Sequence, residues 1–344
     1  MSGESTRYSR QVLFAPIGAA GQEQLRRSSV GLVGLGALGS AIAELLVRAG
    51  IGRLVAVDRD IIEWSNLHRQ GLYGADDAAQ GRPKAVAAGQ RLKQINPDVE
   101  IDTRAVDLGP ANAEAIFAGC DLLIDGTDSF ETRYLLNDLA VSSRRPWIYG
   151  ACVAASGLTV TILPGETPCL ACLFPEPPPS GSQETCDSVG IIAPAASIVA
   201  SIQVTEALKI LTGRLDALRR SLLSIELWPF RIVEIGGRNP APLADCPVCG
   251  QRRFDFLSGR EKSRTQVLCG RDSVQVTPGR PLGSGLDDLA RRLAGVGRVR
   301  CFDTVLHIDT EGLQVSIFPD GRALIRGTTE AERARAIYAR LIGL

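Results

Sequence analysis

The stretch Ser29–Asp60, SVGLVGLGALGSAIAELLVRAGIGRLVAVDRD, decides the fold of this chain. An apolar strand leads into three glycines, Gly34, Gly36 and Gly39, and apolar residues at helical spacing follow them. A second strand then ends at the acidic residue Asp58. This order of strand, glycine turn, helix and acidic strand end is typical of a nucleotide-binding βαβ unit. The glycines predict a nucleotide, but they do not distinguish NAD from ATP.

Further elements extend this unit into an open sheet. The helix after the glycines ends at Gly50 with Arg48 in its last turn, and another strand is predicted over residues 122–128. We therefore predict an α/β, Rossmann-like fold, a mostly parallel sheet with helices on both faces, in a first domain spanning residues 1–254. The strand and helix pattern that follows predicts a small α+β domain over residues 255–344.

Length and composition indicate a globular protein. The chain has 344 residues, of which 45% are hydrophobic, and its 38 basic residues balance its 38 acidic ones. No global charge draws it to nucleic acid or to a membrane surface, so we expect neither as a partner. The polar N-terminus lacks the apolar core of a secretory signal, and the apolar stretch over residues 190–204 is interrupted by Pro194, short of the ~20 residues of a membrane span. We expect a cytoplasmic protein.

The shortage of histidines weakens the NAD interpretation. Hydride transfer to or from a nicotinamide usually requires a nearby proton donor, often histidine. The chain has only His68, in a polar loop, and His307, in an apparent strand of the C-terminal region.

An ATP site needs a ribose acceptor, cations for the phosphates and a carboxylate for magnesium, and the sequence offers all three. Asp58 can accept the ribose hydroxyls, Arg69 and Lys84 can reach the triphosphate, and Asp128 follows a strand at the sheet edge where ligands bind. Each residue also has a structural explanation: Asp58 as the cap of a turn, Arg69 as a surface cation, Asp128 as the N-cap of the next helix.

Four of the nine cysteines have the spacing of a metal site. Cys169 and Cys172 form one CxxC pair, and Cys246 and Cys249 form a second inside CPVCG. Two such pairs predict a closed tetrahedral zinc site with a structural role. The alternatives are two redox pairs or unpaired buried thiols.

Taken together, the motifs resemble the ThiF/MoeB/HesA family, bacterial relatives of ubiquitin-activating enzymes. The resemblance runs in order from about residue 7 to residue 250 and rests on RYSRQ (7–11), GLGALGS (34–40), VDRD (57–60), SNLHRQ (65–70), GRPK (81–84), DGTDSFETRYLLND (125–138), PCLACLFPEPPP (168–179), TCDSVG (185–190) and CPVCG (246–250). It implies an ATP- and magnesium-dependent adenylyltransferase on a Rossmann-like fold. It also implies a homodimer and a ubiquitin-like sulfur carrier protein with a C-terminal Gly-Gly as substrate, in thiamine or molybdopterin biosynthesis.

The resemblance also implies roles for individual residues. Asn66, Arg69 and Lys84 would hold the phosphates, Asp128 the magnesium or the adenylate, and Arg10 would reach into the partner subunit's site. The other nucleotide contacts would come from the same motifs: Gly34, Gly36, Ala37, Gly39, Asp58, Ser65 and Ser129. Ala37 stands where many relatives have a further glycine.

Cys186 follows the proline-rich segment 175–185 and has no second cysteine at CxxC spacing. By the same resemblance it would form a covalent link to the activated carrier or take part in sulfur transfer, with a sulfur donor protein as a further partner. The alternative is an inert loop thiol, because no neighbouring residue in the sequence would lower its pKa.

Two other functions stay open at this point. An enzyme of the same fold can adenylate a different carboxylate, on a peptide or a modified tRNA base. A NAD-binding redox protein is the third possibility, supported by the glycine pattern alone.

Overall fold

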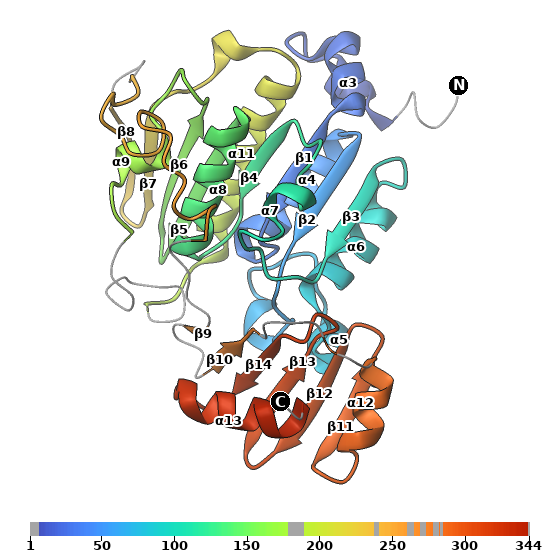
Figure 1. Cartoon of the computed structure of the whole chain (residues 1–344). Helices are drawn as coiled ribbons and strands as arrows, with labels where there is room; N and C mark the ends of the chain where they lie inside the picture. The colour runs from blue at the N-terminus through green and yellow to red at the C-terminus, as the bar shows by residue number, and fades with distance from the viewer. Residues whose placement is uncertain are drawn as a thin grey trace. The chain divides into compact units, whose positions relative to one another are not determined.

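The computed structural model of this chain describes residues 7–177, 189–236, 241–259, 265–268, 273–277, 282 and 285–342. The chain divides into two compact units, Met1–Glu261 and Lys262–Leu344 (Figure 1). The sequence-based domain boundary between residues 254 and 255 stays a prediction.

The first unit is built on one eight-stranded sheet with the order β3-β2-β1-β4-β5-β6-β7-β8. Neighbouring strands from β3 to β5 run parallel, whereas β5 to β8 form an antiparallel meander. The strands are β1 (Ser29–Val33), β2 (Arg53–Val57), β3 (Glu100–Arg104), β4 (Leu122–Asp125), β5 (Trp147–Val153), β6 (Ser156–Ile162), β7 (Leu222–Leu227) and β8 (Phe230–Ile235).

Helices connect and cover these strands. They are α2 (Ser9–Val12), α3 (Gly18–Arg27), α4 (Ala37–Ala49), α5 (Ala75–Gln80), α6 (Lys84–Ile95), α7 (Ala113–Ile116), α8 (Phe130–Ser143), α9 (Leu170–Leu173) and α11 (Ala193–Leu211), with the 3₁₀ turns η1 (Trp64–Asn66) and η2 (Leu215–Ala217). The predicted α/β fold with helices on both faces is confirmed.

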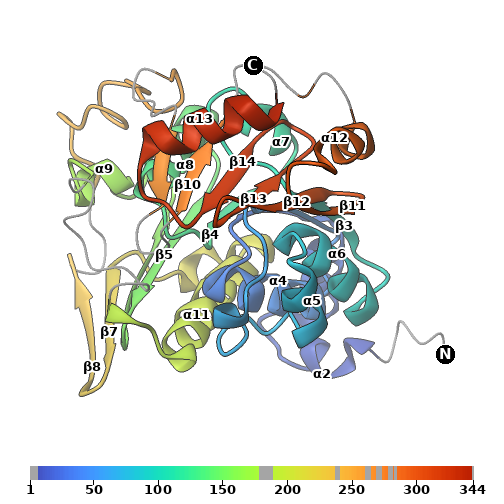
Figure 2. The same cartoon turned by 90° about the horizontal axis from the view of Figure 1, so that it is seen from below.

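The strand alternation sends side chains into two separate cores. Leu54 and Ala56 of β2 pack with α4, α6 and α11, whereas Val55 and Val57 pack with α7 and α8 on the opposite face. Figure 2 shows these two helix layers on either side of the sheet. Both faces are covered, and β1 and β4 at the centre are therefore buried along their whole length and mostly apolar.

The strand order reverses between β1 and β4. From β1 the chain moves to β2 and β3 on one side, and then returns to place β4 on the other side. Connections leave the carboxyl ends of β1 and β4 in opposite directions, and ligands of open α/β sheets bind at this point.

Helix α11 contains most of the apolar stretch over residues 190–204 and extends beyond it to Leu211. It runs for 19 residues through the serines of the apolar stretch, with Pro194 in its first turn, where proline is tolerated. By length and composition alone it is apolar enough to cross a membrane. Half of that apolar window is buried inside the unit, where Val199, Ala200 and Ala207 pack in the core shared with α4. Its apolar surface is therefore that of a central core helix.

The second unit is a six-stranded antiparallel sheet with the order β11-β12-β13-β14-β10-β9. Its helices α12 and α13 share one core with alternate strand residues such as Val315 and Ile325. This confirms the small α+β unit. Its elements are β9 (Thr265–Leu268), β10 (Ser273–Val276), α12 (Leu286–Leu293), β11 (Arg298–Phe302), β12 (Val305–Thr310), β13 (Leu313–Ile317), β14 (Ala323–Arg326) and α13 (Ala331–Ile342).

Three glycines allow β1, α4 and β4 to approach one another closely. Gly34 has a φ of +85°, and a Cβ there would lie 2.6 Å from the carbonyl oxygen of Gly126. A Cβ on Gly39 would lie 1.8 Å from the carbonyl oxygen of Gly34, and one on Gly126 would lie 2.8 Å from the Cα of Gly39. Backbone forms all these contacts, and it cannot move aside as a flexible side chain can.

We predict that Gly39→Ala lowers the free energy of unfolding by about 1–3 kcal/mol, because the new methyl group forces α4 away from the end of β1. Gly71→Ala is the matched control, since a Cβ there has nothing within 4 Å. Urea unfolding measures both free energies. Equal stability of the two variants would contradict the close approach.

Candidate functional site

Asp58 lies directly after β2 and fixes the loop that follows β1. Its Oδ2 accepts a hydrogen bond of 2.6 Å from the backbone N–H of Leu35, and its Oδ1 accepts one of 2.7 Å from the N–H of Asp60. Burial raises the pKa of Asp58, and the charge of Lys84 opposes that rise. The carboxylate therefore shapes the glycine loop as well as lying where a ribose acceptor is expected.

The segment after β2 folds back against the glycine loop. The Tyr73 hydroxyl donates a hydrogen bond of 2.7 Å to the carbonyl oxygen of Leu35. The Nε2 atom of Gln70 lies 3.9 Å from the position of a Cβ on Gly36, so this glycine is less crowded by protein than Gly34 or Gly39. Ala37 is the first residue of α4, next to Gly36 at the helix N-cap. The SNLHRQ segment and the glycine loop are therefore neighbours in space.

Two ion pairs join the ends of β2, β3 and α6. Lys84 begins α6, and its Nζ lies 3.0 Å from Asp60 Oδ2, with 3% of its side chain exposed. Arg59 Nη1 lies 3.2 Å from Asp107 Oδ1 in the loop after β3. A buried lysine next to Asp58 and Asp60 is held in place at the sheet edge that binds ligands.

Asp128 lies exposed between β4 and α8. It does not cap α8, because the side chain of Ser129 is the N-cap and accepts a hydrogen bond of 3.3 Å from the N–H of Thr132. The alternative explanation of Asp128 as the helix cap is therefore wrong. Burial lowers the pKa of Arg59 and of Arg133, but nearby negative charges outweigh it and raise both pKa values. Asp128 is one of those charges.

A buried pair beneath this loop holds the end of β4. Arg133 Nε lies 3.1 Å from Asp125 Oδ2, and Arg133 Nη2 donates 2.7 Å to the carbonyl oxygen of Thr127. Arg133 also lies over the rings of Phe130 and Tyr149. Burial raises the pKa of Asp125 to about 6, and Arg133 counteracts it. The loop that carries Asp128 is thus anchored from below.

The residues of SNLHRQ differ in their exposure. Asn66 is buried, and its Oδ1 accepts a hydrogen bond of 3.0 Å from the N–H of Glu63. Ser65 is exposed and donates to Glu63 Oε2 at 3.5 Å. Arg69 Nη1 donates to the carbonyl oxygen of Ser65 at 2.6 Å. Asn66 therefore has a structural role in this turn, and Arg69 lies across its surface.

Two predicted residues stand apart from this group. Arg10 is exposed on α2, and its guanidinium forms no hydrogen bond or ion pair with the described part of its own chain. Leu13 and Phe14 beside it are 72% and 59% exposed. Cys186 lies outside the described residues.

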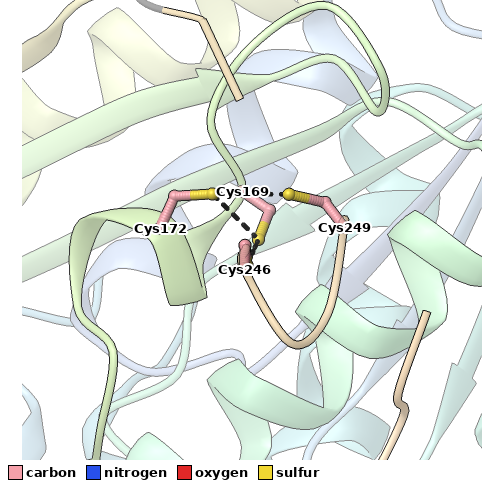
Figure 3. Close-up of side chains that lie close together, drawn as sticks. All are labelled: Cys169, Cys172, Cys246 and Cys249. Atoms are coloured by element: carbon pink, nitrogen blue, oxygen red, sulfur yellow. Dashed lines mark hydrogen bonds between the residues drawn. The ribbon is translucent and has the colours of Figure 1, made fainter. Parts of the chain in front are cut away.

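The four predicted cysteines converge on one point, as Figure 3 shows. Their sulfur atoms all lie within 4.8 Å of one another. The Sγ–Sγ distances are 3.8 Å for Cys169–Cys172, 3.6 Å for Cys169–Cys246 and 3.3 Å for Cys172–Cys249. Zinc at ~2.3 Å from each sulfur of a tetrahedron requires sulfurs ~3.8 Å apart, so the cluster can bind this metal.

The thiols are free rather than joined as disulfides. The hydrogen bond between Cys169 and Cys172 raises the pKa of Cys169 and lowers that of Cys172, which favours a thiolate on the second residue. Thiolates are the form that binds zinc. The interpretation of the two CxxC motifs as separate redox pairs does not fit their convergence.

Helix α8 binds both segments of this cluster. The Asn137 Oδ1 accepts a hydrogen bond of 2.8 Å from the N–H of Leu170, and the Tyr134 hydroxyl donates 2.6 Å to the carbonyl oxygen of Phe174. Asp138 Oδ2 accepts from the N–H groups of Phe256 at 3.0 Å and Leu257 at 3.2 Å. One helix therefore connects the Asp128 loop to the cysteine cluster.

Sequence analysis missed Arg59, Asp60, Asp107, Asp125 and Arg133. Arg59 and Asp60 belong to the quoted motif VDRD at the end of β2. Polar residues at the carboxyl end of a parallel strand lie near the ligand, so this motif could have predicted both. Asp125 and Arg133 lie with Asp128 in the motif DGTDSFETRYLLND, which carried the signal for them. Asp107 comes from the loop after β3, and no spacing in the sequence links it to the site.

Comparison with known proteins agrees with this geometry. The model of the ThiF family matches residues 8–248. The chain is 43% identical to the sulfur carrier protein ThiS adenylyltransferase of Bacillus subtilis over 98% of this chain and 99% of that protein. It is 40% identical to the sulfur carrier protein adenylyltransferase of Thermus thermophilus, over 78% of this chain and 97% of that protein.

Solved structures share the fold. Escherichia coli MccB bound to MccA-N7isoASN matches with a TM-score of 0.61 and 22% identity, over 72% of this chain and 74% of that one. PaaA matches with a TM-score of 0.57 and 27% identity, over 68% of this chain and 74% of that one.

We predict that the purified protein carries one zinc per chain, since the four sulfurs form a closed site. Cys246→Ser should lose the metal and lower the melting temperature, whereas Cys120→Ser leaves the metal content unchanged because Cys120 lies outside the cluster. Elemental analysis gives the metal content of each variant. A wild-type protein without zinc, or a Cys246→Ser variant that keeps it, would refute the assignment.

Proposed function

Because this chain belongs to the ThiF family, we propose that it is an ATP-dependent adenylyltransferase that activates the C-terminal glycine of a ubiquitin-like sulfur carrier protein. The single observation that carries the proposal is the similarity to the Bacillus subtilis ThiS adenylyltransferase along both chains. The Thermus thermophilus relative supports the same activity, and matches only 78% of this chain. The carrier belongs to thiamine or molybdopterin biosynthesis.

The reaction joins a carboxylate to AMP. A carboxylate oxygen of the carrier attacks the α-phosphorus of ATP, the bond from that phosphorus to the bridging oxygen breaks, and pyrophosphate leaves with the electron pair. The product is an acyl adenylate. Negative charge accumulates on the α-phosphate and on the leaving group, so fixed cations accelerate the step.

The sheet edge supplies groups for each part of ATP. Asp58 binds the ribose hydroxyls, and the loop from Gly34 to Gly39 faces the phosphates at the start of α4. Lys84 is buried and its positive charge acts on Asp58, and Arg69 is the partly exposed cation of the neighbouring turn. We assign both cations to the triphosphate.

Asp128 is the magnesium ligand in this proposal. It is exposed, it follows β4 at the switch point of the sheet, and the Arg133–Asp125 pair supports its loop. When bound, magnesium neutralises phosphate charge and orients the leaving group. Its preference for carboxylate oxygen fits an aspartate at this position.

The active unit in this proposal is a homodimer in which Arg10 acts on the partner subunit's nucleotide. The exposed guanidinium of Arg10 and the exposed apolar side chains of Leu13 and Phe14 next to it support a contact with another chain. An arginine there can stabilise the leaving pyrophosphate.

Cys186 acts after adenylation. Its thiolate can attack the acyl adenylate and displace AMP, which gives a carrier thioester, or it can take part in transfer of sulfur from a donor protein. We place the reaction in the cytoplasm.

We predict that adenylation requires Asp128 and Arg69 but not Cys186. Asp128→Asn and Arg69→Ala should lower the exchange of labelled pyrophosphate into ATP, measured with the carrier present, by about 100- to 1000-fold. Cys186→Ala should retain exchange, because a thiol takes part only once the acyl adenylate exists.

Asp76→Asn is the matched control, an exposed aspartate in the first turn of α5. It should exchange at the wild-type rate. If Cys186→Ala were as inactive as Asp128→Asn, with zinc and fold intact, the assignment of two successive steps would be wrong.

We predict that Arg10 acts in trans. An Arg10→Ala chain and an Asp128→Ala chain are each inactive alone, but their heterodimer holds one intact site. A mixture of equal amounts should therefore recover about a quarter of the wild-type sites. Exchange activity measured after subunit mixing tests this, with heterodimers confirmed by affinity tags. Heterodimers without activity would show that Arg10 serves its own chain.

A further inference from the structure

Arg59 is held by carboxylates at the edges of its guanidinium group. Its Nη1 lies 3.2 Å from Asp107 Oδ1, and its Nε lies 4.0 Å from Asp60 Oδ1. Only 21% of the side chain is exposed. Because the guanidinium is planar and two of its edges are held by carboxylates, the direction in which its flat face points is fixed.

The loop that carries Asp107 is itself rigidly built. The Asn112 Oδ1 accepts a hydrogen bond of 2.8 Å from the N–H of Gly109, and its Nδ2 donates 2.9 Å to the carbonyl oxygen of Asp107. Val106 and Leu108 on either side pack on the core that contains α7 and α8. Asp107 is therefore a firm anchor for Arg59.

The position of Arg59 in the sheet indicates which part of a nucleotide it meets. In this fold the phosphates lie at the start of the helix after the first strand, and the ribose lies at the acidic end of the second. The base then extends from the ribose toward the third strand. Arg59 follows Asp58 and bridges from the end of β2 to the loop after β3, on the base side of the ribose.

The charge around Arg59 does not suit a phosphate ligand. Burial lowers the pKa of Arg59, but the charges of Asp107, Asp60 and Asp128 outweigh it and raise that pKa. These three carboxylates offset the positive charge of the guanidinium. A cation surrounded in this way attracts a triphosphate weakly, whereas its flat surface still suits a neutral aromatic ring.

We propose that Arg59, positioned by Asp107, stacks on the adenine of ATP. The inference rests on the proposed function, because it assumes that the nucleotide is ATP. Arg59 binds the base equally in the ground state and in the transition state. It therefore affects the KM for ATP rather than kcat.

The test separates a planar surface from a positive charge. Arg59→Ala removes both, Arg59→Lys keeps the charge, and Arg59→Phe keeps a flat ring. Calorimetry with ATP and with inorganic tripolyphosphate, each with magnesium, separates binding of the base from binding of the phosphates. Arg53→Ala is the matched control, an arginine paired with Asp102 at 3.2 Å at the amino end of β2, the end of the strand opposite to Asp58.

Arg59→Ala and Arg59→Lys should each bind ATP about 10-fold more weakly, as expected for the loss of one stacked base. Arg59→Phe and Arg53→Ala should bind ATP as the wild type does, and tripolyphosphate affinity should change in none of the variants. In pyrophosphate exchange, Arg59→Lys should show a raised KM for ATP with kcat unchanged.

Rescue by lysine, or a parallel loss of tripolyphosphate binding, would make Arg59 a phosphate ligand and overturn the inference. Unchanged ATP affinity in Arg59→Lys would overturn it as well. A wild-type protein that binds no ATP would instead refute the proposed function. Arg59→Lys keeps a cation beside Asp107, so it tests the inference even if Arg59→Ala fails to fold.

Discussion

The close packing of backbone on backbone at Gly34, Gly39 and Gly126 is the constraint on which this structure depends. It lets the start of α4 approach the carboxyl ends of β1 and β4 without intervening side chains. The N–H groups at the start of α4 are thereby presented beside Asp58, which accepts the N–H of Leu35. The glycines determine the shape of the nucleotide loop through contacts within the protein, before any ligand is bound.

Helix α8 transmits this geometry to the far side of the unit. At its start, Ser129 caps the helix and Arg133 binds Asp125 beneath the Asp128 loop. Further along, Asn137 and Asp138 bind the two segments around the cysteine cluster. Removing one partner of a buried ion pair typically lowers stability by about 3–5 kcal/mol. The Arg133–Asp125 pair therefore holds the end of β4 firmly in place. A structural metal and a nucleotide loop thus depend on the same helix.

Charges in the candidate site are paired before any nucleotide is present. Lys84 is paired with Asp60, and Arg59 with Asp107, so each cation has a defined position despite a flexible side chain. Prior positioning lowers the entropy lost when ATP binds and suits a reaction that depends on the placement of charge. Arg69 is partly exposed and Asp128 is exposed, so solvent reaches both side chains in the isolated chain.

Local sequence determined the βαβ unit, the acidic end of β2 and the two CxxC pairs, because each depends on residues a few positions apart. The same locality made the fold class and the second unit predictable. The convergence of the two pairs on one point was predicted from their spacing, and the structure confirms it. Tertiary structure alone decided that Ser129 rather than Asp128 caps α8 and that the apolar stretch becomes a core helix. It also decided the Arg59–Asp107 pair, which joins the segments that follow two different strands. Such contacts depend on which strands become neighbours in the sheet. The spacing of residues along the sequence does not determine that strand order.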